Sequence, residues 1–447
     1  MKTINRRNFL KASAIAGAGL TLAPNLTFAQ GKQSNNKPAL LGGRKSSYGF
    51  SRWPIYDRTE EKALLDVLHT NKWGRLNGTT TAKFEAAYAK IHGTAHSLAV
   101  SSGTSALYTM FGALDVGPGD EIILPVYTFV ASYNVVVLNY ALPVLIDTDI
   151  ETFQIDAKKI EQAITPQTKL LMPVHIGGSP ADLDTILDMG KKHNLPVIED
   201  ACQAHLAEWK GKKVGSFGLG GAFSFQSSKN LNCAEGGAIT SDSKEFIDQC
   251  YTFHNQGQGG TGTSYATGSG TRGTNLRLTE FQAGLLLAQM ARLEQQARTR
   301  SENASYLTQL FNDIPGITPA KLYKGTTNSA YHLYMFRYHQ SEFAGLSRER
   351  FIEALSAEGV PCSTGYGQMN SSDYVLGLAK NKHYLKIYGE KTMKEWVERN
   401  QCPQNDKLTK EQSLWFTQTM LLGDRSDMEK IAEAVRRIQK FAKQLKK

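Results

Sequence analysis

The chain has 447 residues, of which 41% are hydrophobic and 21% are charged, a composition typical of a globular protein with two or three domains. The formal net charge is +10; the first 29 residues supply four of these charges and no acidic residue, which leaves +6 for the rest. No block of basic residues with interleaved aromatic residues occurs, so the sequence favours no nucleic-acid partner. The five cysteines are widely spaced and match neither a disulfide framework nor a zinc site, so no metal is predicted.

The first 29 residues have the features of a bacterial export signal. Residues 5–11, Asn-Arg-Arg-Asn-Phe-Leu-Lys, form a twin-arginine pattern, an Ala/Gly-rich apolar stretch follows over residues 12–22, and residues 27–29 resemble a cleavage site. The apolar stretch is shorter than the roughly 20 residues of a membrane-spanning helix, so we expect no stable membrane insertion. The sequence therefore predicts a periplasmic or otherwise exported protein. The alternative is a cytoplasmic protein with an amphipathic N-terminal extension.

A linker or arm over residues 30–50 precedes a long region in which helical and strand patterns alternate. Residues 59–69 and 81–92 have apolar side chains at helical spacing. Strands that alternate with helices predict an α/β fold with a mostly parallel sheet flanked by helices, in which ligands bind at the carboxyl ends of the strands. The short apolar segments typical of buried strands are residues 97–100, 121–124, 144–146, 169–174, 197–200, 222–225 and 237–240.

The character of the sequence changes after about residue 315, where helix–strand alternation gives way to a mixed pattern. We therefore expect a large domain over residues 51–314 and a smaller C-terminal α+β domain over residues 315–447. The middle of the smaller domain, residues 365–404, is polar and variable in pattern. Helical spacing occurs at residues 276–293, 298–311, 348–357 and 428–445, and strand alternation at residues 331–338.

Lys229 and Asp200 indicate the chemistry. Lys229 follows an aromatic strand segment, Phe223-Ser-Phe, and Asp200 ends the buried run at residues 197–200. Pyridoxal 5'-phosphate requires an amine for a Schiff base and a carboxylate for its pyridinium nitrogen, and we predict these two roles for Lys229 and Asp200. To carry protons, Lys229 needs a pKa well below about 10.4. The alternatives are a surface lysine and an aspartate that caps a helix.

Two segments could bind the phosphate of this cofactor. Gly103 and Thr104 lie directly after a short strand, in Ser102-Gly-Thr-Ser, where a helix is predicted to start and backbone N–H groups bind anions. Ser224, a polar residue between two phenylalanines, is the second candidate. The alternatives are an ordinary capped strand-to-helix turn and simple strand alternation.

The ring of the cofactor needs further contacts. Phe129, in Pro125-Val-Tyr-Thr-Phe-Val, is predicted to stack on the pyridine ring, although an isolated phenylalanine is more often part of the core. Gln203 lies three residues after Asp200, one turn away if the segment is helical, and is predicted to contact the phenolic oxygen of the same ring.

Five segments together resemble a known family: residues 101–107, 199–203, 223–229, 235–237 and 273–280. They are similar to the fold-type I pyridoxal-phosphate enzymes of the DegT/DnrJ/StrS sugar-aminotransferase family, and the similarity extends from about residue 51 to 440. The resemblance implies the Schiff-base role for Lys229, the pyridinium contact for Asp200 and a homodimer in which Asn275 reaches the phosphate of the neighbouring subunit. It also places Gly103, Thr104, Ser224, Phe129 and Gln203 at cofactor-binding positions.

Within the family, residues 50–57, 71–75 and 402–405 look like the branch that contains glutamine:scyllo-inosose aminotransferases and 3-amino-5-hydroxybenzoate synthase. This resemblance implies ping-pong transfer of an amino group from glutamine or glutamate to a keto-sugar or keto-cyclitol. Ser363-Thr-Gly-Tyr replaces the His-Tyr element of nucleotide-sugar members, which weakens a nucleotide-sugar acceptor. Some family members carry histidine in place of the lysine and act as dehydratases, so Lys229 favours amination.

Other functions stay open on the sequence. They are dehydration or aromatisation on the same cofactor, a non-catalytic cofactor-binding regulator, and binding of an anionic envelope polymer. Arg277 and Arg337 are candidate clamps for a substrate carboxylate, and residues 363–403 are expected to shape the acceptor pocket. Cys202 and Cys233 flank the predicted cofactor site and are either reactive or buried as small hydrophobic side chains.

Overall fold

The computed structural model describes residues 36–259 and 272–446. The predicted export signal, residues 1–29, lies outside these ranges, as does the first part of the predicted linker. Within the described ranges, no helix combines the length and the apolar character needed to cross a bilayer.

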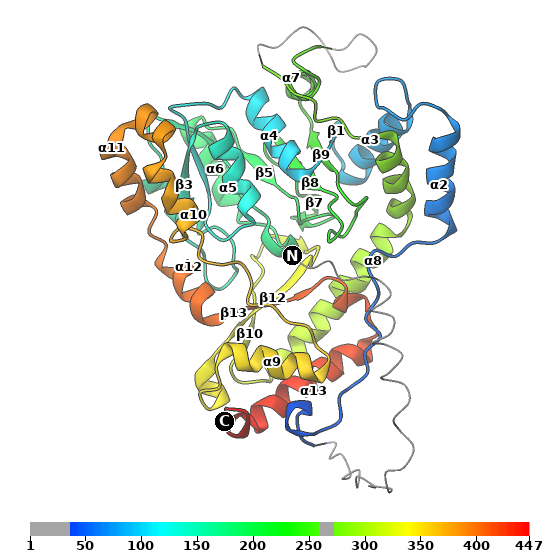
Figure 1. Cartoon of the computed structure of the whole chain (residues 1–447), viewed down its shortest axis with the longest axis vertical. Helices are drawn as coiled ribbons and strands as arrows, with labels where there is room; N and C mark the ends of the chain where they lie inside the picture. Colours follow the sequence, from blue (N-terminus) through cyan, green and yellow to red (C-terminus); the bar gives the residue numbers. More distant parts are fainter. Residues whose placement is uncertain (1–35, 260–271, 447) are drawn as a thin grey trace, which may run out of the picture.

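A mixed β-sheet forms the centre of the larger, upper part of the molecule (Figure 1). A three-stranded half in the order β3-β2-β4 meets a four-stranded half in the order β1-β9-β8-β5, and parallel bridges from Leu171 to Val197 and from Val174 to Asp200 join them. Strand β9 runs antiparallel to β1 and β8, and the other pairings in this sheet are parallel, which confirms the mostly parallel sheet. The strands are β1 His96–Val100, β2 Glu121–Pro125, β3 Leu142–Ile146, β4 Thr168–Leu171, β5 Ile198–Asp200, β8 Gly220–Ser224 and β9 Gly237–Ser241.

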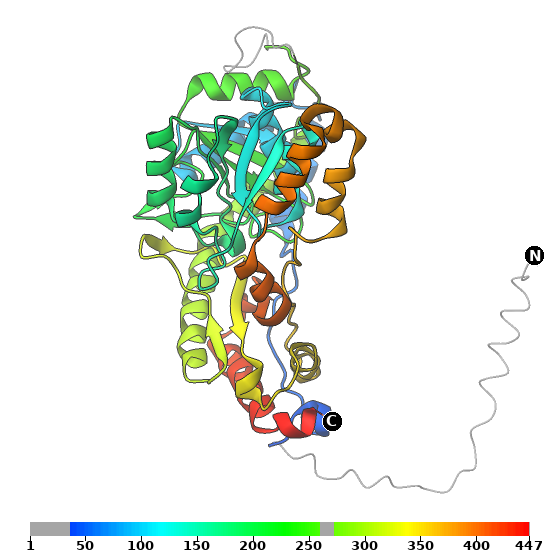
Figure 2. The ribbon, with the colours of Figure 1, turned by 90° about the vertical axis from the view of Figure 1, so that its left-hand side faces the viewer.

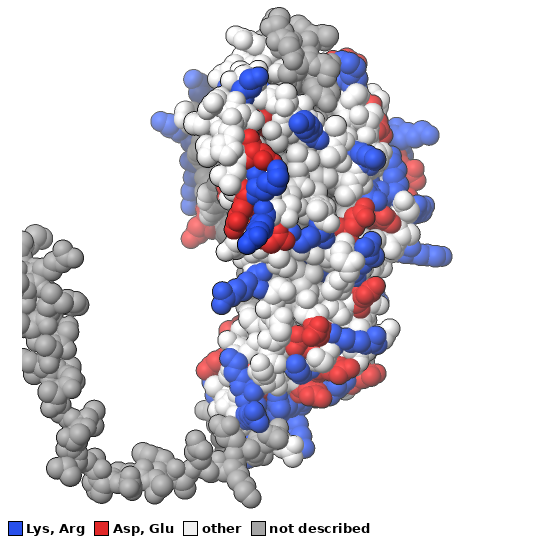
Figure 3. All heavy atoms as spheres, turned by 90° about the vertical axis from the view of Figure 1, so that its right-hand side faces the viewer, with Lys and Arg blue, Asp and Glu red and all other residues white. Residues whose placement is uncertain are grey.

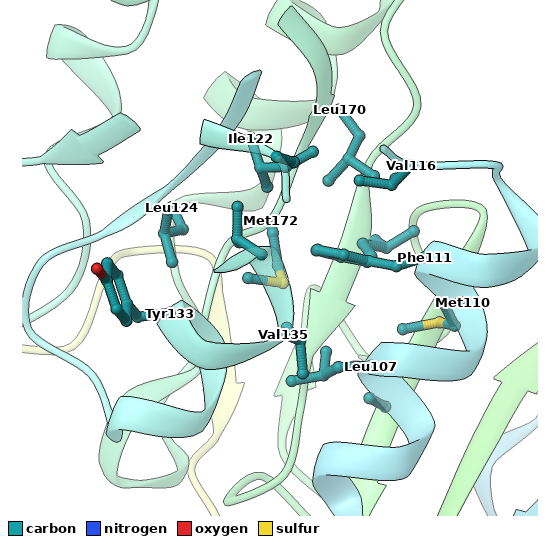
Figure 4. Packing of buried hydrophobic residues seen from close by; sticks show 14 of the residues in the cluster. Leu107, Met110, Phe111, Val116, Ile122, Leu124, Tyr133, Val135, Leu170 and Met172 are labelled. Carbon is teal, nitrogen blue, oxygen red and sulfur yellow. The ribbon is translucent and has the colours of Figure 1, made fainter. Parts of the chain in front are cut away.

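Helices cover both faces of this sheet, because its strands are apolar on both sides. α4, α5 and α7 pack on one face, where Phe111 of α4, Ile122 of β2 and Val135 of α5 belong to one hydrophobic cluster (Figure 4). α3, α6 and α8 cover the other face. The helices are α3 Thr80–His92, α4 Gly103–Ala113, α5 Val130–Leu138, α6 Leu183–His193, α7 Lys244–His254 and α8 Glu280–Asn312.

The lower part of the molecule is a smaller α+β unit (Figure 1). Its antiparallel sheet has the order β10-β12-β13, and α9 and α13 pack near it in a separate hydrophobic core. α8 runs without interruption from the upper to the lower part and contributes Leu307 and Phe311 to the lower core. The elements are β10 Ile317–Pro319, β12 Leu333–Tyr338, β13 Ser413–Thr417, α9 Arg348–Glu358, α13 Arg425–Lys440 and α14 Ala442–Leu445.

The polar segment in the middle of the C-terminal region returns to the upper part of the molecule. α10 (Asp373–Leu376) and α11 (Lys382–Arg399) lie beside α5 and β3, as Figure 2 shows. Trp396 donates its indole N–H to the carbonyl of Pro143 at 2.6 Å, and Tyr384 donates to the carbonyl of Ala141 at 2.9 Å. These residues are therefore chiefly an outer layer of the large sheet.

Some predicted boundaries were wrong. The helix predicted from residue 276 begins at Glu280, because Thr279 and Gln282 form a capping box, and it continues through the gap left between the two predicted helices. The strand predicted over residues 169–174 ends at Leu171. The remaining elements are α2 Arg58–His69, α12 Pro403–Lys407, β6 Glu208–Trp209, β7 Lys212–Lys213 and β11 Thr326–Asn328.

Candidate functional site

A pocket of about 770 Å³ lies at the carboxyl ends of β1, β2, β4, β5 and β8. Loops that follow parallel strands meet at this edge of a sheet, so residues from distant parts of the sequence converge here. Seven of the predicted site residues line this one pocket: Gly103, Thr104, Phe129, Asp200, Gln203, Ser224 and Lys229.

Asp200 faces the pocket because side chains alternate along β5. Ile198, two residues earlier, belongs to the core beneath α4 and α5, and Asp200 points to the same face. Its Oδ2 accepts a hydrogen bond from the Ser132 hydroxyl at 2.7 Å, and Oδ1 accepts from the backbone N–H of Cys202 at 3.2 Å. The carboxylate is buried yet retains pocket exposure, so it is held in one orientation.

Glu199 points to the opposite face and has a structural environment. Its carboxylate lies 3.0 Å from His175 Nε2 and accepts backbone N–H groups of Gly215 and Phe217 at 2.8 and 2.7 Å. Burial alone would raise the pKa of Glu199, but the His175 contact and these N–H groups hold it below its ordinary value. Of the two adjacent acids, only Asp200 belongs to the pocket.

Lys229 lies in the connection between β8 and β9, where its backbone N–H closes a turn onto the carbonyl of Gln226 at 2.8 Å. Burial lowers the pKa of the Lys229 amine, although Cys202 and Asp200 act in the opposite direction. A lowered pKa is what proton transfer requires, because the amine must be uncharged to accept a proton. The neighbouring Asn230 bonds to His332 Nδ1 at 3.2 Å and to the carbonyl of Ala330 at 2.8 Å, which anchors the connection.

The start of α4 packs tightly against β8 and β9. A Cβ atom on Gly103 would lie 2.6 Å from Ser224 Cβ and 2.8 Å from Cys202 Sγ. A Cβ on Gly237 would lie 2.3 Å from the carbonyl oxygen of Ser102. The helix is capped by Ser102, whose hydroxyl accepts the N–H of Ser105 at 3.0 Å, so its first N–H groups remain directed at the pocket.

A buried imidazole supports the strand that carries Ser224. His205 Nε2 lies 2.9 Å from the Ser224 carbonyl, and its Nδ1 lies 3.0 Å from the Tyr88 hydroxyl. Burial lowers the pKa of His205 to about 3. The ring is therefore neutral, with Nε2 donating to the carbonyl and Nδ1 accepting from tyrosine.

Phe129 and Gln203 lie on the walls of the pocket. Phe129 is 54% exposed, which argues against a core role, and it ends the loop before α5. The predicted helical turn between Asp200 and Gln203 is absent, because the chain makes successive turns there. The Oε1 of Gln203 accepts the N–H of Gly177 at 2.8 Å and its Nε2 donates to the Tyr366 hydroxyl at 2.8 Å. Burial raises the pKa of Tyr366 to about 12, so the phenol is neutral.

Three of the predicted residues, Asn275, Arg277 and Arg337, do not line this pocket. Asn275 is exposed and forms a β-bridge with Asn255, whose side chain in turn accepts from Arg277 at 2.9 Å. Arg337 lies on β12, in the sheet of the smaller unit. Of residues 363–403, only Tyr366 reaches the pocket wall.

The two flanking cysteines are not thiolates. Burial raises the pKa of Cys202 well above its ordinary value, and it raises that of Cys233 as well. Cys233 directs its sulfur to the carbonyl of Glu235 at 3.1 Å. Both therefore resemble small buried side chains more than reactive groups.

Several pocket residues were missed by the sequence analysis. Ser132 lies one helical turn after Thr128 in the loop already singled out, so that spacing could have revealed it. Trp53, His332 and Gln418 come from the N-terminal arm and the smaller unit. No local pattern marks them, because only the packing of the two parts brings them to the pocket.

A mostly parallel sheet, with an amine opposite a carboxylate at its carboxyl edge and a helix N-terminus beside them, defines the class: a fold-type I pyridoxal-phosphate transferase. Residues 54–412 match the model of the DegT/DnrJ/EryC1/StrS aminotransferase family, and the chain belongs to that family. Residues 3–23 match the signal sequence of the twin-arginine translocation pathway.

Characterised relatives span nearly the whole chain. It is 35% identical to the L-glutamine:2-deoxy-scyllo-inosose aminotransferase of Streptoalloteichus tenebrarius, covering 86% of this chain and 93% of the relative. It is 30% identical to the 3-amino-5-hydroxybenzoate synthase of Amycolatopsis mediterranei, covering 86% and 96%. A crystal structure of 3-amino-5-hydroxybenzoic acid synthase superposes with a TM-score of 0.77 at 30% identity, covering 87% of this chain and 98% of that one.

Substitution of Gly103 tests the tight packing at the start of α4. We expect Gly103→Ala to lower the free energy of unfolding by about 1–3 kcal/mol, because its Cβ overlaps Ser224 and Cys202. Gly117→Ala is the control, since no atom lies within 4 Å of a Cβ built there. Urea unfolding of both variants measures the difference, and equal stability would contradict the packing argument.

A second expectation concerns pH. His205 has a folded pKa of about 3 against an ordinary value of 6.5, so the unfolded chain binds its proton first as pH falls. Its contribution is fully present above pH 6.5 and is lost at about 1.4 kcal/mol per pH unit below that, until about pH 3. The stability advantage of wild type over His205→Gln should therefore shrink between pH 7 and pH 5 in urea unfolding. A pH-independent difference would mean that burial does not lower the pKa of His205.

Proposed function

We propose that the protein binds pyridoxal 5'-phosphate and transfers the amino group of glutamine or glutamate to a keto-cyclitol or keto-sugar. The observation that carries this proposal is the pairing of Lys229 and Asp200 across one pocket. Family membership supports the aminotransferase reaction, and the relatives named above support a glutamine donor and a carbocyclic acceptor.

The residues present fit the cofactor. Gly103 lets the start of α4 lie against Ser224, where a Cβ would clash, and the N–H groups that begin α4 and the Ser224 hydroxyl suit a phosphate dianion. Asp200, oriented by Ser132, suits a protonated pyridine nitrogen. Phe129 offers an exposed aromatic face at the pocket wall. At about 770 Å³, the pocket has the size expected for a cofactor and a small substrate together.

Bound there, the cofactor supplies an electrophilic carbon for the amino group and a ring that withdraws electrons. Lys229 provides the amine that anchors it and, once released, accepts and returns a proton at Nζ. Because burial lowers the pKa of Lys229, a larger fraction of its amine is uncharged at a given pH than in an exposed lysine. Asp200 would accept a hydrogen bond from the ring nitrogen, and Gln203 retains an N–H for the ring oxygen besides the one that bonds Tyr366.

The pocket wall opposite the cofactor is aromatic and hydroxylated, which suits a polyhydroxylated ring. Tyr366 lies edge-on to Trp415 with ring centroids 4.7 Å apart, and Thr417 and Thr419 hydroxyls lie 3.0 Å from each other. Apolar faces and hydroxyl groups side by side match the two chemical characters of a cyclitol. One relative is named a 3-amino-5-hydroxybenzoate synthase, which keeps dehydration or aromatisation as the second candidate.

A homodimer is part of the proposal. Exposed apolar side chains gather on α2 and the loop after it: Leu64, Leu65, Leu68, Trp73 and Leu76. This side of the molecule faces the viewer in Figure 3, where the centre of the upper part shows few charged side chains among the described residues. A second copy would cover these side chains, and Asn275 would then reach the phosphate of that copy.

The twin-arginine signal suggests where the protein acts. A receptor of that pathway recognises the N-terminal signal. Resemblance to proteins that use the pathway implies export of a folded protein with its cofactor already bound. We propose that the chain acquires its cofactor before export and works outside the cytoplasm, in the periplasm where one is present.

The cofactor assignment is tested by the visible absorbance of the purified protein. Wild type should show the visible absorption band of an imine-linked cofactor, and L-glutamine or L-glutamate should bleach this band. Lys229→Ala should lose amino transfer by at least about 10²–10⁴-fold because it lacks the amine. Lys210→Ala, an exposed lysine paired with Asp184, serves as control.

Three results would go against this assignment. Absence of any band after reconstitution would exclude the cofactor. A band that no amino acid bleaches would favour dehydration chemistry or a non-catalytic regulator. Full activity of the Lys229→Ala protein would remove the lysine from the reaction.

The role of Asn275 is tested by mixing two inactive proteins. Asn275→Asp places a negative charge where the partner's phosphate would bind, and we expect it to weaken cofactor affinity. If Asn275 acts across the dimer, a hybrid with Lys229→Ala contains one intact site, so mixed subunits should recover activity and cofactor binding. A hybrid that recovers neither, although light scattering shows dimers, would place Asn275 in its own subunit's site. An Asn275→Asp protein with normal activity and cofactor affinity would place Asn275 in no site.

A further inference from the structure

Arg300 is a fully buried arginine in the middle of α8, and within the described part of the chain no acidic side chain acts on it. Its Nε donates to Gln418 Oε1 at 2.8 Å, but Nη1 and Nη2 have no hydrogen-bond partner. An unpaired charge in the interior is strongly unfavourable unless an anion accompanies it. Because Nη1 and Nη2 of the planar guanidinium group have no partner, they suit two oxygen atoms of one ligand carboxylate.

The surroundings of Arg300 belong to the pocket wall. Gln418 and Trp53 both line the pocket, and the guanidinium lies over the Trp53 ring, with its carbon 5.4 Å from the ring centroid. The amide Nε2 of Gln418 is also buried without a partner, so a second unused donor lies beside the fork. This part of the wall therefore has three nitrogen atoms, Arg300 Nη1 and Nη2 and Gln418 Nε2, whose N–H groups lack a hydrogen-bond acceptor.

This wall lies near the predicted reacting centre. His332 lines the same pocket, and the charges of both Lys229 and Arg300 lower its pKa, after burial as the main cause. The ring of His332 therefore lies within electrostatic reach of both cations. Gln418 is bound to the chain of His332 as well, since its backbone N–H donates to the His332 carbonyl at 3.1 Å.

We propose that Arg300, together with Gln418, binds the α-carboxylate of the amino-acid donor. Gln418 is held by one side-chain hydrogen bond, so rotation of its amide uncovers the fork to the pocket, and the carboxylate then accepts from Nη1 and Nη2. The two arginines predicted from the sequence do not line the pocket, which leaves Arg300 as the buried guanidinium beside it among the described residues. This inference rests on the proposed aminotransferase function and assigns its donor subsite.

The test compares a donor with and without its carboxylate. The probes are L-glutamine and L-glutamine α-amide, and the readout is the concentration that half-bleaches the visible band. In Arg300→Met that concentration should rise at least about 30-fold for L-glutamine, the effect of removing one partner of a buried charge pair, and change little for the amide. Arg298→Met, an exposed arginine on the same helix, is the matched control and should behave as wild type.

Further variants separate recognition from folding. Gln418→Leu keeps Arg300 and should shift the L-glutamine response in the same direction by a smaller factor. Arg300→Ala should regain part of its L-glutamine response when guanidinium ion is added at millimolar concentration, which a purely structural role would not produce. Calorimetry with glutarate, a carboxylate without an amine, should show binding to wild type and none to Arg300→Met.

The outcomes distinguish this inference from the function on which it rests. If wild type responds to L-glutamine and Arg300→Met responds equally, or loses both probes equally, the donor subsite is wrong while the aminotransferase stands. If the variant keeps a normal donor response but no longer aminates a carboxylate-bearing ketone, the carboxylate belongs to the acceptor and the proposal is overturned. If no amino acid bleaches wild type, the proposed function itself fails.

Discussion

The close approach of α4 to β8 and β9 is the constraint on which the site depends. Gly103 and Gly237 leave no space for side chains, so the first turn of the helix lies directly on the strands. That contact places the helix N-terminus, Ser224 and Cys202 within one pocket, next to the connection that carries Lys229. Because the sheet is rigid and apolar on both faces, the positions of these polar groups are fixed by the core beneath them rather than by the loops.

The balance of charge in the pocket follows from burial. Lys229 has a lowered pKa and Arg300 lacks an anion, while Asp200 is the carboxylate that bonds Ser132 at the far side. His205 and His332 are neutral because they are buried. Lys229 in the pocket and Arg300 behind its wall are thus two cationic groups that suit phosphate and carboxylate groups of ligands.

The smaller unit completes the pocket and bears on specificity. Its Tyr366, Trp415 and Gln418 face the cofactor edge of the large sheet, while the helices over residues 373–399 pack against β3 and α5 away from it. Differences in acceptor are therefore expected to depend on these wall residues and the N-terminal arm at Trp53.

The sequence alone determined the α/β class, because the alternation of strands and helices is a local pattern. Its motif segments carried the resemblance to the family and included six of the seven predicted residues that converge on the pocket, all but Phe129. It placed Asp200 at the end of a strand and Lys229 beyond the end of another, and it assigned the ring-nitrogen contact to Asp200. The structure adds that the adjacent Glu199 points to the opposite face, where it contacts His175. Tertiary structure decided that Arg277 and Arg337 lie away from the pocket and that Arg300, Gln418, His332 and Trp53 form or back its wall. The physical reason is that these residues meet only when α8, the N-terminal arm and the smaller unit pack together, and burial, which sets their charge states, exists only in that packed chain.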